Sequence, residues 1–157
     1  MGGYTLVQRI EPYALAKSGR QVKLTLRASS ATAYGAFIER IYISQPAPGG
    51  YPYDSAVDLT EVNPKFNIPG GQALTLPWVR YTLDAEQPLL IAVDFTELTG
   101  IKYRLVKTRG GGPFGLPPVL PIGIAYRHTG LEAALRNRSA DYGSVNRIYF
   151  IERIEVR

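Results

Sequence analysis

The chain has 157 residues, of which 45% are hydrophobic and 20% are charged, so it is long and apolar enough to fold around a core. It contains no cysteine and one histidine, which excludes disulfides, thiol chemistry and transition-metal sites. We therefore expect no metal and no cofactor. No apolar run approaches the roughly 20 residues of a membrane helix, so membrane insertion is not expected.

Apolar and polar residues alternate along much of the chain, which predicts strands. The expected strands are residues 3–10, 21–27, 36–44, 57–62, 66–68, 73–76, 78–83, 89–95, 101–106, 122–127 and 149–156. The one expected helix is short, about 131–137, because Leu131 and Leu135 are four residues apart. Short strands at this spacing predict an all-β fold, a single antiparallel β-sandwich domain over residues 1–157 that is jelly-roll-like.

The run Phe-Ile-Glu-Arg-Ile occurs twice, at residues 37–41 and 150–154. Both copies are rich in β-branched and aromatic residues, which favours strands over helices. Strict alternation would place Glu39 and Glu152 among apolar side chains on a core face, where an unpaired carboxylate is costly. Each glutamate is therefore expected either to be turned outward by a β-bulge or an edge position, or to meet an arginine. Neither is interpreted as catalytic.

The search for catalytic and nucleotide-binding patterns finds none that is convincing. Gly110, Gly112 and Gly115 match G-x-G-x-x-G, but Pro113 and later prolines forbid the helix whose N-terminus would hold a pyrophosphate. No pattern around His128 would orient it in a catalytic triad, and a packing or surface role is favoured. No pair among the thirteen acidic residues is singled out for glycosidase chemistry. The sequence predicts a protein that is not an enzyme.

Aromatic side chains are the remaining candidates for binding. The chain has eleven tyrosines and one tryptophan, and flat rings stack on sugars and anchor protein interfaces. The alternative is that most of these rings fill the core or its rim. A glycan site would require an exposed row, with Tyr51, Tyr53 and Trp78 on one concave face. The candidate glycan- or partner-binding residues are Tyr51, Tyr53, Trp78, Tyr126 and Tyr142.

Residues 107–121 form a Pro/Gly-rich segment that holds four of the twelve prolines. Irregular segments of this length inside domains are often functional. This one is either a solvated loop or an arm that docks its apolar residues on a neighbouring subunit, which would predict a homo-oligomer or contact with another protein partner. The candidate assembly residues are Arg109, Phe114, Leu116, Val119 and Leu120.

The net charge of +5 raises the question of nucleic acid. The basic residues are spread over many strands and are dense only at residues 102–109 and 127–138. A solvated face with a mild basic excess accounts for this as well as a phosphate-binding patch would. Nucleic acid is therefore not expected as a partner. An anionic surface, such as a capsid lattice or a cell-surface polymer, is favoured.

Short motifs along nearly the whole chain follow a recognisable order. They are the run at 18–26, the Ile-rich strand at 41–43, Tyr53-Asp54 in a loop of small residues, the Pro-Gly-Gly turn at 69–71, the apolar run at 89–95 and the closing strand at 149–156. In this order they resemble the β-sandwich modules of tail, fibre and other structural proteins of bacteriophages and prophages. Similar modules accompany hydrolase domains that act on acylated sugars.

The resemblance implies a jelly-roll-like sandwich without catalytic residues, placed in a virion after synthesis in the host cytoplasm. Two roles stay open within it. One is a capsid decoration, fibre-base or tail-associated protein that assembles on a lattice and contacts the host surface. The other is a glycan-binding accessory module of a tail fibre or hydrolase. The family's Tyr-Asp loop matches Tyr53 and Asp54, for which a loop-closing role is expected. The chain departs from the pattern at 107–121, where its arm is longer.

Overall fold

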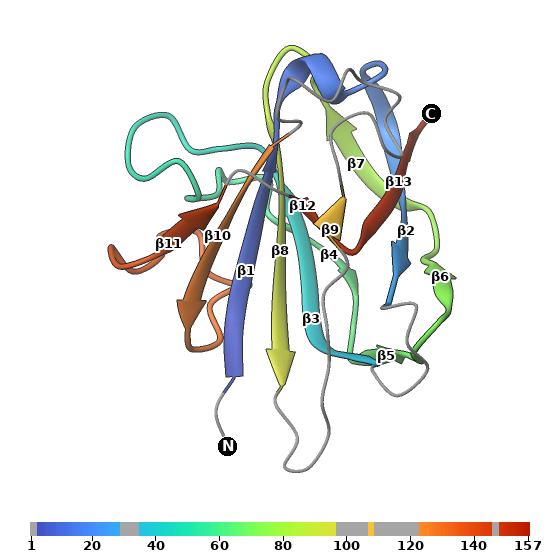
Figure 1. Cartoon of the computed structure of the whole chain (residues 1–157). Helices are drawn as coiled ribbons and strands as arrows, with labels where there is room; N and C mark the ends of the chain where they lie inside the picture. Colours follow the sequence, from blue (N-terminus) through green and yellow to red (C-terminus); the bar gives the residue numbers. More distant parts are fainter. Residues whose placement is uncertain (1–2, 29–34, 97–106, 109–122, 146–147) are drawn as a thin grey trace.

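The computed structural model describes residues 3–28, 35–96, 107–108, 123–145 and 148–157. In this part of the chain a short 3-10 helix, η1 (Pro12–Ala14), accompanies thirteen strands. The strands are β1 (Gly3–Ile10), β2 (Gly19–Arg27), β3 (Ala36–Ser44), β4 (Thr60–Asn63), β5 (Phe66–Ile68), β6 (Ala73–Thr75), β7 (Val79–Leu83), β8 (Leu89–Thr96), β9 (Lys107–Thr108), β10 (Gly123–Thr129), β11 (Gly143–Val145), β12 (Ile148–Tyr149) and β13 (Ile151–Val156). The predicted all-β class is confirmed (Figure 1).

Two antiparallel sheets pack against each other as a β-sandwich. The larger has the strand order β11-β10-β1-β8-β3-β4, and β5 also pairs with β3. In the smaller sheet β2 lies between β13 and β6 and also pairs with β7. The strands β9 and β12 form a separate two-stranded pair. Figure 1 shows the layer of β1, β8 and β3 beside the layer of β2, β7 and β13.

The core lies between the sheets because each strand turns its apolar residues to the same side. In β2, the side chains of Val22, Leu24 and Leu26 are completely buried, while Lys23 between them and Arg27 after them are not. The same alternation in the larger sheet fills the opposite side of this core. Its buried residues there include Ile41, Ile43, Ile91, Val93 and Phe95. Hydrophobic burial at this core is the main stabilising contribution to the fold.

Strand β8 is buried on both faces. Its inward residues join the main core, whereas Leu90 and Ala92 belong to a second apolar cluster together with Val7, Tyr53 and Ala133. This agrees with the near-continuous apolar run that marked residues 89–95 in the sequence. A second covered face means that chain segments lie over the outside of the larger sheet, and these segments build the candidate site.

Both glutamates of the repeated motif sit at β-bulges. The register of β3 with β8 shifts between Ile38 and Arg40, at Glu39, and the register of β13 with β2 shifts at Glu152. The prediction of a bulge is confirmed for both. Each carboxylate also has a partner at the surface. Glu39 accepts a hydrogen bond from Thr96 and pairs with Lys65, while Glu152 pairs with Arg27 at 2.7 Å.

The predicted helix at 131–137 is wrong. These residues form turns, with one hydrogen bond from the Leu135 N–H to the Glu132 carbonyl. The N–H groups of Glu132 and Ala133 donate to side chains of the sheet beneath, which competes with a helix. Strand β4 starts at Thr60, three residues later than predicted, and β11 and η1 have no counterpart among the predicted elements. The predicted strand at 101–106 lies outside the described residues.

The closing strand predicted at 149–156 is interrupted at Phe150. This residue has a φ of 47°, in the left-handed region, although its ring is buried and meets Phe95 edge-on at 5.4 Å. The unusual conformation lies where the chain stops pairing with β9 and starts pairing with β2. The burial of the ring holds the backbone in a conformation that it would otherwise avoid.

Candidate functional site: the tyrosine–histidine face

Two loops, residues 45–59 and 130–142, cover the outer face of the larger sheet on the side of β10 and β11 (Figure 1). They are joined to each other, since the Ser55 N–H donates to the Arg136 carbonyl and the Arg138 N–H donates to Asp54. Together they gather five rings, which we call the tyrosine–histidine face. The rings are those of Tyr51, Tyr53, Tyr126, His128 and Tyr142.

Four of these rings form one stack. Tyr51 lies parallel to Tyr53 at 5.3 Å, Tyr53 lies on Tyr142 at 4.3 Å, and Tyr142 lies on His128 at 4.9 Å. Tyr126 leans against the stack, with its centroid 5.1 Å from that of Tyr53. Such contacts add to the energy of burial. The sequence marked all four tyrosines as candidates, and the fold brings them together.

The stack exposes its ends rather than its middle. Tyr53 and Tyr126 are buried, with 4% and 8% of their surfaces exposed, whereas Tyr51 is 44% exposed. Tyr53 is further fixed because its hydroxyl donates to the Ser139 carbonyl at 2.9 Å. Thus Tyr53 and Tyr126 position the other rings, and a ligand would meet Tyr51 at one end or His128 at the other.

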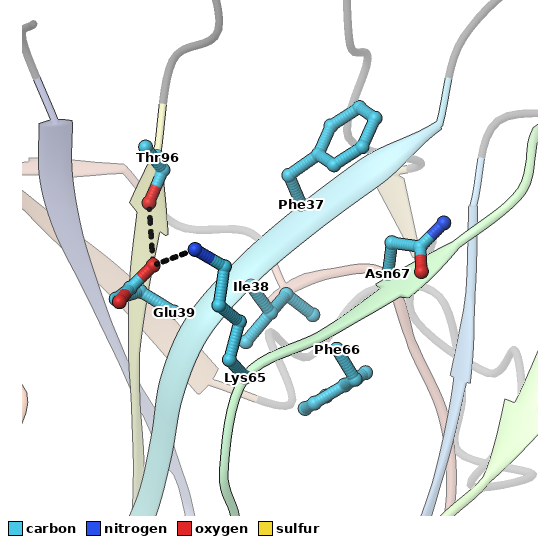
Figure 2. Close-up of a pocket in the computed structure, with 7 residues that line it drawn as sticks. All are labelled: Phe37, Ile38, Glu39, Lys65, Phe66, Asn67 and Thr96. Atoms are coloured by element: carbon cyan, nitrogen blue, oxygen red, sulfur yellow. Dashed lines mark hydrogen bonds and ion pairs between the residues drawn. The ribbon is translucent and has the colours of Figure 1, made fainter.

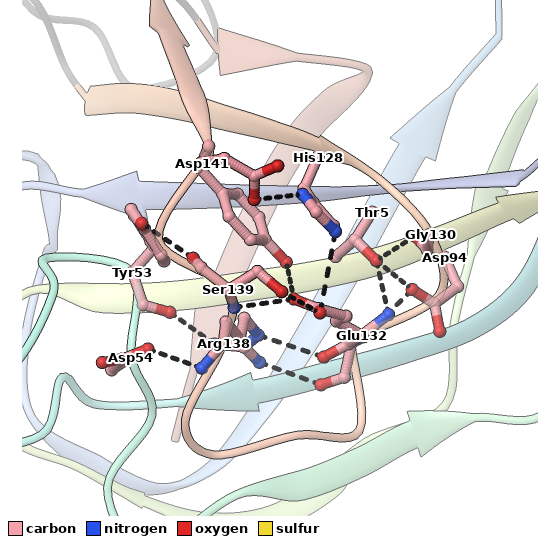
Figure 3. Close-up of polar contacts among 12 residues, drawn as sticks. Thr5, Tyr53, Asp54, Asp94, His128, Gly130, Glu132, Arg138, Ser139 and Asp141 are labelled. Atoms are coloured by element: carbon pink, nitrogen blue, oxygen red, sulfur yellow. Dashed lines mark hydrogen bonds and ion pairs between the residues drawn. The ribbon is translucent and has the colours of Figure 1, made fainter.

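Arg138 joins the two loops from inside. Its side chain is buried, and its guanidinium donates to the carbonyls of Tyr53, Ala133 and Glu132 and to the Ser55 hydroxyl (Figure 3). Burial lowers the pKa of Arg138, while nearby negative charges, including that of Glu132, oppose this shift. A guanidinium suits this position because its donors fan out in one plane toward several acceptors.

Asp54 closes the first loop. Its carboxylate accepts hydrogen bonds from the Tyr51 N–H at 3.0 Å and from the Arg138 N–H at 2.8 Å. Its backbone carbonyl accepts from the Ala47 N–H. The loop-closing role expected for the Tyr53-Asp54 pair is therefore seen for Asp54, while Tyr53 contributes through its ring and hydroxyl.

The imidazole of His128 lies between two carboxylates. Its Nδ1 is 2.9 Å from Asp141 Oδ1, and its Nε2 is 3.6 Å from Glu132 Oε1. Glu132 also accepts hydrogen bonds from the Ser139 hydroxyl at 2.5 Å and from the Tyr142 hydroxyl at 2.9 Å (Figure 3). Burial would raise the pKa of Glu132, but these hydrogen bonds and the nearby His128 hold it below its ordinary value.

An open cavity of about 410 Å³ lies at the His128 end of the stack. Its wall offers donors and acceptors in close proximity, including the largely exposed carboxylate of Asp141. The backbone at Gly143 adds polar groups without a side chain to fill the space. The lining residues are Arg127, His128, Thr129, Asp141, Gly143 and Ser144. Arg127 is held in place because its guanidinium lies over the Tyr4 ring at 4.3 Å.

The acid, histidine and serine of this cluster do not have the arrangement of a hydrolytic triad. In a triad the serine hydroxyl donates to the imidazole. Here the hydroxyl of Ser139 donates to Glu132, and the same carboxylate faces Nε2 of His128. The cluster therefore has the geometry of a polar network that fixes side chains around a cavity.

Trp78, the fifth aromatic candidate, lies away from the tyrosines. Its ring faces Lys23 and Arg157 at the smaller sheet, so it does not share a face with Tyr51 and Tyr53 as a single row of sugar-stacking rings would require. The arm candidates Arg109, Phe114, Leu116, Val119 and Leu120 lie outside the described residues. Only the first two residues of the arm are described, as β9.

A second cavity, of about 350 Å³, lies at the ends of β3 and β5. Its floor is apolar, with Phe37, Ile38 and Phe66, and its rim carries the Glu39–Lys65 ion pair and Thr96 (Figure 2). The candidate site is placed at the tyrosine–histidine face, because aromatic rings and polar groups meet there at one cavity.

Sequence reasoning missed the polar half of the site. His128 was interpreted as a packing or surface residue, and Glu132, Arg138 and Asp141 carried no recognisable pattern. The one feature that these four residues share in the sequence is that they lie within residues 127–141, where charged residues are dense. The sequence alone does not indicate that this segment lies over a sheet.

Within the described ranges, no three histidine, aspartate or glutamate side chains are arranged to hold a metal ion, and no helix is long and apolar enough to cross a membrane. No protein-family model matches the chain, and no curated protein matches its sequence.

Proposed function

We propose that this protein is a non-enzymatic β-sandwich module that binds a glycan at the tyrosine–histidine face. The observation that carries this proposal is the stack of Tyr51, Tyr53, Tyr142 and His128, which ends at an open polar cavity. Sugars present hydroxyl groups beside apolar ring faces, so their sites combine charged or polar groups with aromatic rings.

The cavity supplies the polar part of this chemistry. Asp141 can accept hydrogen bonds from two neighbouring sugar hydroxyls, and the Ser144 hydroxyl can donate to a third. The Asp141 carboxylate is already held in position, since it bonds His128 Nδ1. Groups that are held in advance lose less entropy when a ligand binds.

Replacing Asp141 with asparagine is expected to weaken sugar binding at least tenfold, a loss of about 1.4 kcal/mol that matches a charged hydrogen bond. The side chain of Asp141 is 75% exposed, so the variant should remain folded. The measurement is a titration of the ¹⁵N-labelled protein with methyl glycosides of glucose, galactose, rhamnose and N-acetylglucosamine. Amide shifts are expected at Thr129, Gly143 and Ser144.

The matched control is Glu86→Gln, which removes an exposed carboxylate from a turn that does not line the cavity. It should leave the sugar affinity unchanged. The proposal is wrong if none of the glycosides shifts the cavity amides up to its solubility limit, or if Asp141→Asn and the parent protein bind equally well.

For the setting of this activity we propose a phage virion, in which the protein is a structural component at the capsid, fibre base or tail. The sequence resemblance suggests this role. A structural observation that favours subunit contact is the exposure of large apolar side chains on the two loops of the site. They are Val57 at 81%, Leu131 at 50% and Leu135 at 48%.

Assembly through these side chains predicts a homo-oligomer whose mass falls when they are made polar. In Val57→Ser/Leu135→Ser, the mass measured by light scattering should drop to that of one chain, with the far-ultraviolet circular dichroism of the parent. The control is Tyr13→Ser, which removes an exposed apolar side chain that lies outside both loops of the site. This variant should keep the parent's mass. A parent protein that is monomeric throughout the accessible concentration range would contradict self-assembly by this surface.

A further inference from the structure

The outer face of the smaller sheet carries a row of positive side chains. Because Val22 and Leu24 of β2 point into the core, alternation places Lys23 on the outer surface. Directly opposed residues of antiparallel strands share a face, so the partners of β2 extend this surface across the sheet. We call it the cation face. Its positive residues are Lys23, Arg27, Arg80, Arg153 and Arg157.

Two carboxylates partly neutralise the row. Glu155 forms two ion pairs, since its Oε2 lies 3.3 Å from Lys23 Nζ and 3.4 Å from Arg153 Nε. Glu152 pairs with Arg27. Five cations thus share two carboxylates, and the face keeps an excess of positive charge. Such an excess raises the local concentration of anions.

The remaining two cations form no ion pair within the described residues. Arg80 lies opposite Gln21 in the register, and Arg157 donates from Nε to the Gln21 amide oxygen at 2.6 Å. The Arg157 guanidinium also lies 4.2 Å from the centre of the Trp78 ring, and the Lys23 ammonium lies 4.7 Å from it. The tryptophan therefore holds two positive groups in place at the surface.

We propose that the cation face is a second binding surface, and that its partner is an acidic polysaccharide. Neighbouring strands are about 4.8 Å apart and outward residues along a strand about 7 Å apart, so neighbouring cations on this face lie within reach of successive sugar rings of one polymer. A polymer with one carboxylate per sugar ring can meet several of them in succession. Guanidinium groups such as that of Arg80 bind carboxylates through two parallel hydrogen bonds.

The neutral residues between the cations favour sugar over nucleic acid. Thr75 and Gln21 share the outer face and offer hydroxyl and amide groups suited to sugar hydroxyls. Single-stranded nucleic acid is held by several rings on which bases stack. This face has one ring, that of Trp78, and cations already lie over it.

The test is binding of polygalacturonate to the purified protein, followed by calorimetry at low and at physiological salt, with neutral dextran as the comparison polymer. Polygalacturonate should bind, dextran should not, and salt should weaken the binding severalfold. Arg80→Gln/Arg157→Gln is expected to lower the affinity at least tenfold, because it removes the two cations without carboxylate partners. Lys65→Gln, which removes an exposed charge at the larger sheet, should leave the affinity unchanged.

Three outcomes would overturn this inference: no binding of polygalacturonate, binding that the double variant does not weaken, or equally tight binding of duplex DNA through the same arginines. The last would assign the face to nucleic acid. Asp141→Asn keeps the two sites separable. It should weaken glycoside binding at the cavity at least tenfold and leave polygalacturonate binding intact, so either site can fail without the other.

Discussion

Replacing Arg138 with alanine is expected to lower the free energy of unfolding by about 3–5 kcal/mol, the range found when one partner of a buried charged network is removed. The side chain is buried, and its guanidinium satisfies the carbonyls of Tyr53, Ala133 and Glu132 and the Ser55 hydroxyl. Alanine would leave a cavity and would strand these acceptors away from water, at a cost of about 1–3 kcal/mol for each unsatisfied group.

Urea unfolding followed by far-ultraviolet circular dichroism measures this loss. The near-ultraviolet signal of the tyrosines should fall as well, because the loop that carries Tyr53 would no longer be fixed against Tyr142. Arg136→Ala is the matched control. Arg136 lies two residues away in the same loop, and its side chain is exposed, so its replacement should change stability by less than about 0.5 kcal/mol. Equal effects of the two substitutions would contradict a clamping role for Arg138.

The regular part of the fold was predictable because its signals are local. Strands β1, β3 and β8 follow the alternating or continuous apolar pattern of their residues. The bulges at Glu39 and Glu152 were predictable too, since a carboxylate on a core face must be turned away or paired. These inferences need only neighbours in sequence and the cost of burying charge.

The candidate site was only half predictable because its contacts are distant in sequence. Aromatic residues in loops suggested Tyr51, Tyr53 and Tyr142, but nothing local indicated that Tyr53 would stack on Tyr142 across nearly ninety residues. The helix expected around Leu131 failed for the same reason. Backbone N–H groups there bond to side chains of the sheet beneath, including that of Asp94, and this tertiary bonding outweighs the weak helical pattern.

The contribution of Asp94 to the stability of the protein is expected to fall as pH rises from about 4, because burial raises the pKa of its carboxyl on folding. Its carboxyl is buried in the central strand, and its Oδ2 has no hydrogen-bond partner. Burial raises the pKa of Asp94 above 3.8, although hydrogen bonds from Thr5 and the Ala133 N–H and the charge of Arg40 act against this shift. Arg138 and Glu132, from the loop above, are the other charged groups near it.

Thr5 joins Asp94 to the loop above it. Its hydroxyl donates toward Asp94 Oδ1 at 2.6 Å and toward the Gly130 carbonyl at 2.8 Å, and its oxygen accepts from the Glu132 N–H at 2.6 Å. The hydroxyl has one hydrogen, so the two acceptors must share it. An ionised Asp94 is therefore incompletely hydrogen-bonded, with no partner at Oδ2, which adds to the cost of its burial.

The sign of the pH dependence follows from linkage. A carboxyl whose pKa is raised on folding contributes stability that is complete below its unfolded pKa, near 3.8, and is lost as pH rises through its folded pKa. The loss approaches about 1.4 kcal/mol per pH unit for one proton. The measurement is the unfolding free energy of the protein and of Asp94→Asn from about pH 4 to about pH 8, because asparagine has nearly the same size and does not titrate.

Subtracting the two curves removes the contributions of every other titrating group and leaves that of Asp94. The advantage of the parent protein over the asparagine variant should be greatest at the acid end and should shrink as pH rises. A constant difference, or one that grows with pH, would mean that Asp94 is ionised when folded and that the two N–H groups of the loop outweigh its burial. Because the same loop carries Glu132 and Arg138, the hydrogen bond from the Ala133 N–H to Asp94 also helps to hold the tyrosine–histidine face in place.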